Sequence, residues 1–131
     1  MILLDTSFII DLYKGVDSTK PLLGELRGRS VATTTVSVFE VLAGVHHLRL
    51  KEEERHFARF FSTVRLLSVD RPSAEQASRI MGELMRIGKQ VNALDAIIAG
   101  IALANKAEAM VTRDEDFLEI AKVADLNVRT Y

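Results

Sequence analysis

The chain has 131 residues, a formal net charge of −1 and a hydrophobic fraction of 48%, which predicts one domain over residues 1–131 with a real core rather than a disordered chain. The absence of cysteine excludes disulfides, thiolate metal sites and a cysteine nucleophile. Without a charged and apolar leader or an apolar run of membrane-spanning length, the sequence indicates a soluble, cytoplasmic protein with no membrane partner.

Predicted strands and helices alternate along the chain. The strands are expected at 2–4, from Val31, at Leu66–Val69, from Ala109, and at 127–131. The helices are expected at 7–14 (ended by Gly15), 19–28, 37–48, from Lys51, 73–87, 92–105 and 116–124. This alternation predicts an α/β fold with a largely parallel central sheet of four to five strands and helices on both faces.

Acidic residues occur where these strands and helices meet. Asp5 follows the first strand directly, and Asp114 follows the fourth. Glu40 and Asp95 are placed in the first turns of two helices, each among apolar neighbours. Because ligands of open α/β sheets bind beyond the carboxyl ends of the strands, the four carboxylates are predicted to converge at one rim.

Each acid also has a purely structural interpretation. Ser37-x-x-Glu40 and Asn92-x-x-Asp95 have the spacing of a capping box, and the other two acids could cap the helices that follow them. Four carboxylates on one rim would nevertheless repel one another and raise their pKa values. A bound divalent cation would relieve that repulsion, and Mg²⁺ accepts a site made of oxygen ligands alone.

The stretches that carry these acids are DTSFIID, SVFEVLAG, NALDAIIA and VTRDEDF. In this order and at this spacing they resemble the motifs of the PIN-domain ribonucleases. The resemblance is closest to the VapC toxins of prokaryotic toxin–antitoxin pairs, and it covers essentially the whole chain. A PIN-like fold is therefore expected.

The resemblance implies a set of site residues and partners. The family's four acids fall on Asp5, Glu40, Asp95 and Asp114, and Asp116 matches a further acid found in many members. The small hydroxyl residues that steady the family's site fall on Ser7 and Thr112. The family further implies cleavage of RNA with Mg²⁺ or Mn²⁺, a homodimer, and inhibition by a cognate antitoxin.

A hydrolytic mechanism can be argued for these residues. Metal ions held by Asp5, Asp95 and Asp114 would activate a water and offset charge on the phosphate, while Glu40 would bind metal through water or orient the attacking water. The hydroxyls of Thr6, Ser7 and Thr112 are expected mainly to cap backbone groups.

Several readings stay open at this level. Arg113 could contact phosphate or neutralise the acids, and the sequence favours neither. Two other functions are also compatible with the residues: a PIN-like regulatory or binding module with little nuclease activity, and a phosphoaspartyl-type hydrolase that uses Asp5 as nucleophile. The second lacks the lysine that such enzymes usually need at a strand end.

Overall fold

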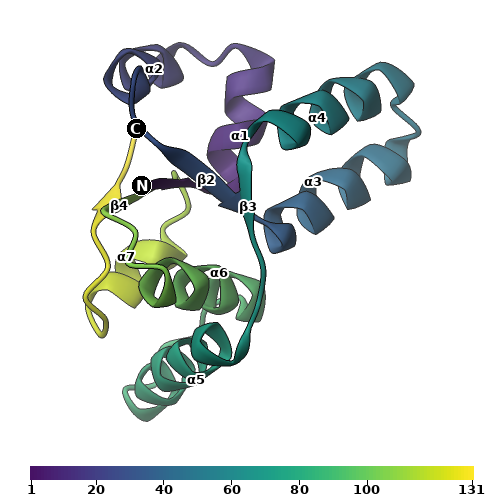
Figure 1. The fold of residues 1–131 in the computed structure, drawn as a ribbon. Coiled ribbons are helices and arrows are strands. Elements are labelled where there is room, and N and C mark those ends of the chain that lie inside the picture. The colour runs from purple at the N-terminus through teal and green to yellow at the C-terminus, as the bar shows by residue number, and fades with distance from the viewer.

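Five short strands form one parallel sheet in the computed structural model, which describes residues 1–131 (Figure 1). Their order across the sheet is β3-β2-β1-β4-β5. The strands are β1 (Ile2–Leu4), β2 (Val31–Thr34), β3 (Arg65–Leu67), β4 (Ala109–Val111) and β5 (Val128–Arg129). The predicted parallel α/β fold is confirmed, although β3 begins one residue before the predicted Leu66–Val69 segment and ends two residues before its end.

Helices connect every pair of consecutive strands. They are α1 (Thr6–Lys14), the 3₁₀ helix η1 (Asp17–Thr19), α2 (Lys20–Leu26), α3 (Thr35–Leu48), α4 (Lys51–Thr63), α5 (Arg71–Arg86), α6 (Ala93–Ala104) and α7 (Asp116–Ala121). None of them is long and apolar enough to cross a membrane.

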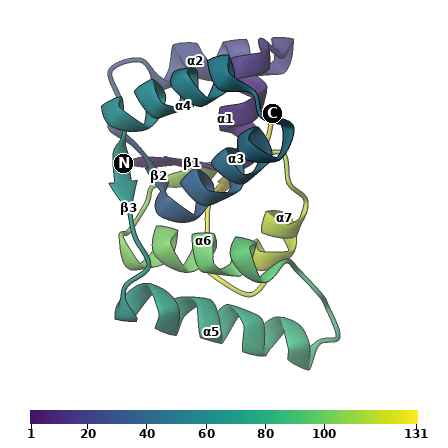
Figure 2. The same cartoon turned by 90° about the vertical axis from the view of Figure 1, so that its right-hand side faces the viewer.

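The sheet has a hydrophobic core on each face, because alternate residues of a strand point to opposite sides. Leu3 and Met110 join the core formed with α5, α6 and α7, whereas Ile2, Leu4 and Val111 join the core formed with α1–α4. Figures 1 and 2 show the two groups of helices on opposite sides of the strands, as predicted.

Two helices begin earlier than the sequence suggested. The N-cap of α3 is Thr34, whose Oγ1 accepts a hydrogen bond from Ser37 N at 3.0 Å, and the N-cap of α5 is Asp70, whose Oδ1 accepts from Ser73 N at 2.9 Å. The predicted capping box of Ser37 and Glu40 is therefore wrong. Glu40 lies in the second turn of α3, where its carboxylate has no role in capping.

Helices α5 and α6 approach each other unusually closely at Gly100. A Cβ placed on this residue would lie 2.4 Å from the carbonyl oxygen of Ser73 and 2.8 Å from the Cβ of Ala77. Both neighbours belong to α5, and one of them is backbone that cannot rotate away.

Gly100→Ala is therefore expected to lower the free energy of unfolding by about 1–3 kcal/mol through overpacking. Gly82→Ala is the matched control, because Gly82 is also helical and has no atom within 4 Å of an added Cβ. The control should be neutral or stabilising by roughly 0.5–1 kcal/mol, since alanine favours helix. Urea denaturation compares the two, and equal stability of both variants would contradict the close contact.

Candidate active site

Asp5 is held in one orientation at the end of β1, where it caps α1. Its side chain is buried, and Oδ2 accepts hydrogen bonds from Ser7 N (3.3 Å), Ser7 Oγ (2.9 Å) and Thr112 Oγ1 (2.8 Å). The other oxygen, Oδ1, is buried and has no hydrogen-bond partner. The prediction that these hydroxyls mainly cap backbone groups is thus incomplete. Ser7 and Thr112 also orient the carboxylate of Asp5, and they leave its Oδ1 without a hydrogen bond.

Asp95, Asp114 and Asp116 bring their carboxylates together beside Asp5. One oxygen from each of the three lies within 4.8 Å of the others. Burial, the charge of Asp114 and a hydrogen bond with Asp116 raise the pKa of Asp95 to about 8, and the charge of Asp5 adds to the shift. Asp116, which the sequence indicated only as a further acid, is therefore a full member of this group.

The start of α6 is capped without Asp95. Asn92 Oδ1 accepts a hydrogen bond from Leu94 N at 2.9 Å, as expected for the N-cap. The Asn92 N–H, which a capping box would pair with Asp95, instead donates to Asp116 Oδ2 at 3.0 Å. The capping interpretation of Asp95 is therefore wrong, and helix capping does not explain why its carboxylate is buried.

Glu40 faces the same acids from α3. Thr6 Oγ1 donates a hydrogen bond to Glu40 Oε1 at 2.8 Å. Burial raises the pKa of Glu40, the hydrogen bond from Thr6 opposes that shift, and the charges of Asp5 and Asp114 increase it. The four acids predicted from the sequence therefore lie close enough to influence one another, although they come from four separate parts of the chain.

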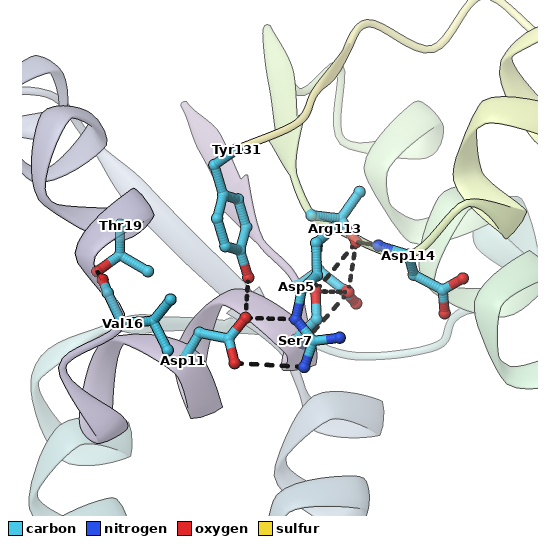
Figure 3. Close-up of polar contacts among 9 residues, drawn as sticks. Asp5, Ser7, Asp11, Val16, Thr19, Arg113, Asp114 and Tyr131 are labelled. Carbon is cyan, nitrogen blue, oxygen red and sulfur yellow. Dashed lines mark hydrogen bonds and ion pairs between the residues drawn. The ribbon is translucent and has the colours of Figure 1, made fainter.

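We define the acidic cluster as these five side chains: Asp5, Glu40, Asp95, Asp114 and Asp116. No lysine, arginine or histidine forms an ion pair with any of them. Arg113 instead forms an ion pair with Asp11, in which Nε donates a hydrogen bond to Oδ2 and Nη2 donates one to Oδ1 (Figure 3). Arg113 thus does not neutralise the cluster in this structure, and its hydrogen bonds to Asp11 lower the pKa of that carboxyl.

Two residues of this neighbourhood were missed in the sequence. Asp11 is buried, and Tyr131 OH donates to its Oδ2 at 2.8 Å (Figure 3). Asp11 carried a usable signal, since it lies among apolar residues in FIIDLY just as Glu40 and Asp95 lie among theirs. Tyr131 carried none, because its contact depends on where β5 ends.

The acidic cluster has the donor set of a divalent cation site. All its ligand atoms are carboxylate oxygens, which suit hard cations such as Mg²⁺ and Mn²⁺. The unpartnered Oδ1 of Asp5 is a buried polar atom that needs a ligand, and the cluster has no protein cation to offset its charge. The residues present therefore fit a bound divalent cation.

The acidic cluster should make the stability of the metal-free protein fall as pH rises. The pKa of Asp95 is about 8 in the folded chain against 3.8 without its surroundings, so between these values the folded chain retains a proton that the unfolded chain has lost. Asp5 and Glu40 are shifted in the same direction. We expect a lower melting temperature at about pH 8.5 than at about pH 6, with Mg²⁺ reducing the difference; a melting temperature that rises over this range without metal would contradict the repulsion.

The comparisons with known proteins agree with this geometry. The sequence model of the PIN domain matches residues 2–123. Ribonuclease VapC7 of Mycobacterium tuberculosis is 28% identical over 131 residues, which cover 94% of this chain and 88% of VapC7.

Solved structures of toxin–antitoxin proteins share the fold. VapBC2 of Rickettsia felis, bound to a DNA fragment from the promoter, includes a chain with a TM-score of 0.85 at 22% identity, covering 100% of this chain and 99% of that one. A toxin–antitoxin complex from Klebsiella pneumoniae includes a chain with a TM-score of 0.74 at 25% identity, covering 95% of this chain and 96% of that one.

Proposed function

This chain belongs to the PIN domain family, and from that premise we propose that it is an endoribonuclease that hydrolyses RNA phosphodiesters with Mg²⁺ or Mn²⁺. The acidic cluster carries the proposal: five acids from four parts of the chain share one site, no protein cation balances them, and Asp5 Oδ1 is buried without a partner. The similarity to ribonuclease VapC7 supports RNA as the substrate.

Asp5, Asp95, Asp114 and Asp116 would hold the cation. When bound, the cation would activate a water molecule and offset negative charge on the phosphate. Ser7 and Thr112 keep one oxygen of Asp5 engaged, so that Oδ1 is presented as the ligand.

Glu40 has a separate role in this proposal. The hydrogen bond from Thr6 fixes its carboxylate, and burial raises its pKa, which makes the ionised carboxylate a stronger base. We therefore assign Glu40 to orienting and deprotonating the water.

A cognate antitoxin is the proposed inhibitor. The Klebsiella pneumoniae structure is a toxin–antitoxin complex, and VapC7 covers nearly the full length of the present chain. Assembly as a homodimer remains a prediction from the family resemblance, and light scattering at micromolar concentration would test it.

The alternative functions have less support. A phosphoaspartyl hydrolase would need a lysine beside the phosphorylated Asp5, whereas no lysine forms an ion pair with any acid of the cluster. A regulatory module with little nuclease activity would not need the costly burial of Asp95.

Incubation with a short RNA tests the proposal. We expect cleavage with Mg²⁺, loss of cleavage in EDTA, and recovery when Mg²⁺ or Mn²⁺ is added in excess. The control variant Asp17→Asn removes an exposed acid that pairs only with Lys20 and should cleave normally. A protein that binds Mg²⁺ but leaves a panel of RNAs intact would reject nuclease activity and favour the regulatory module.

A further inference from the structure

Asp11 is a buried acid that the proposed reaction does not use. Only 5% of the residue is exposed, and it lies on α1 outside the acidic cluster. Its two oxygens accept three hydrogen bonds, two from Arg113 and one from Tyr131. A carboxylate that accepts hydrogen bonds from two of the three nitrogens of a guanidinium fixes the plane as well as the position of that group.

Tyr131 is itself anchored. Its ring packs edge-on against Phe8 of α1, with centroids 5.2 Å apart and an interplanar angle of 77°. Phe8 is fully buried in the core between the sheet and α1. Tyr131 therefore has a fixed location from which its hydroxyl reaches Asp11, and Figure 3 shows the two side chains pointing toward each other.

Arg113 occupies the middle of the turn that leaves β4. On one side of it, Thr112 Oγ1 donates to Asp5 Oδ2 (2.8 Å) and accepts from Asp114 N (3.0 Å). The Arg113 N–H donates to Ser7 Oγ at 3.2 Å. The backbone of this turn and the orientation of Asp5 thus depend on the same few hydroxyls, and the only ion pair in the turn is that of Arg113 with Asp11.

We propose that Asp11 and Tyr131 are positioning residues that clamp Arg113 and thereby set the affinity of the acidic cluster for Mg²⁺. The clamp fixes the Thr112–Asp114 turn against α1, so that Asp114 meets the carboxylates of Asp95 and Asp116. Residues one step removed from metal ligands commonly change metal affinity or activity about 10–100-fold when replaced. This inference rests on the proposed function for the role of the metal.

The competing role for Arg113 is direct contact with an RNA phosphate. Its side chain is 57% exposed, so the guanidinium is accessible from solvent while it pairs with Asp11. If Arg113 bound phosphate, breaking the clamp would release it and alter KM for RNA. If the clamp positions Asp114, breaking it would alter the Mg²⁺ dependence instead.

Asp11→Asn and Tyr131→Phe test the clamp. Asp11→Asn breaks the ion pair, and Tyr131→Phe removes one hydroxyl while keeping the ring on Phe8, so it should fold even where Asp11→Asn does not. Tyr13→Phe is the matched control, because Tyr13 lies on α1 with its ring against His56 and Phe57, and its hydroxyl makes no hydrogen bond in the structure. Glu75→Gln is the ion-pair control, since it removes the exposed Arg71–Glu75 pair on α5, which belongs to another part of the molecule.

Titration calorimetry with Mg²⁺, on protein shown to be folded, is the readout that does not need cleavage. We expect roughly 10-fold or greater weakening of Mg²⁺ binding in both clamp variants, with unchanged binding in both controls. Cleavage should fall at low Mg²⁺ and recover at high Mg²⁺, with KM for RNA unchanged.

Two results would overturn the clamp: Mg²⁺ affinity equal to that of the parent in both clamp variants, or a changed KM for RNA with the parent's Mg²⁺ affinity. Failure of the proposed function is separable from either, since a parent protein that binds Mg²⁺ without cleaving RNA would leave the calorimetric comparison intact.

Discussion

Replacing Asp95 with asparagine should abolish most activity and stabilise the metal-free protein. Cleavage is expected to fall on the order of 10³-fold, as for loss of one charged group at the centre of a reaction. Asparagine resembles the protonated acid that the raised pKa of Asp95 implies, and it can still donate a hydrogen bond to Asp116. The amide therefore removes one negative charge from the acidic cluster and keeps the hydrogen bond to Asp116.

The stabilisation should depend on pH. Below about pH 4 the acid is protonated in both the folded and the unfolded parent, so the variant should melt close to the parent. Between about pH 4 and about pH 8 only the unfolded parent loses this proton, so the variant should gain an advantage of several degrees in melting temperature that grows with pH and levels off above about pH 8. Calorimetric melts with and without Mg²⁺ measure the difference, with Asp17→Asn as the exposed control. A marked loss of metal-free stability would show that Asp95 mainly supports the fold.

Asp5→Asn should be equally inactive, on the order of 10³-fold below the parent, for a different reason. The amide oxygen can replace Oδ2 and keep the hydrogen bonds from Ser7 and Thr112, and asparagine is a good N-cap for α1. The amide nitrogen then replaces Oδ1, the oxygen without a partner. The fold should persist while the cluster loses one ligand.

Substitution of the three histidines separates this account from metal-free cleavage by the 2′-hydroxyl. His46 and His47 are exposed near the end of α3, and the ring of His56 lies 4.5 Å from that of Tyr13. Changing all three to glutamine should leave cleavage measurable, while circular dichroism verifies that both this variant and Asp5→Asn are folded. Activity that survives Asp5→Asn but disappears with the histidines would reverse the assignment.

The fold was predictable because its signals are local. Short apolar or β-branched runs such as Ile2–Leu4 and Val31–Thr34 alternate with helical periodicity, and that alternation favours a parallel sheet. The starts of α3 and α5 were misplaced because Ser37 and Ser73 look like N-caps, whereas residues nearer the preceding strands take that position. A threonine can both end a strand and cap a helix, and sequence spacing does not separate these roles.

The candidate site was predictable only as a set of acids. Their positions at strand ends and helix starts brought four of them together correctly, even though the capping interpretation of Glu40 and Asp95 was wrong. The partner of Arg113 could not be predicted, because Asp11 is on α1 and the contact depends on how the turn after β4 lies against that helix. Contacts between side chains that are far apart in the sequence depend on how the helices and turns pack, and the spacing of residues along the chain does not predict that packing.

Analysis of the RNA termini after cleavage tests the central claim most directly. If the acidic cluster acts through a metal-activated water, cleavage in Mg²⁺ yields fragments with a 5′-phosphate and a 3′-hydroxyl, and EDTA stops it. Fragments that end in a 2′,3′-cyclic phosphate and form in EDTA would contradict the account and remove the catalytic roles given to Asp5, Glu40, Asp95 and Asp114.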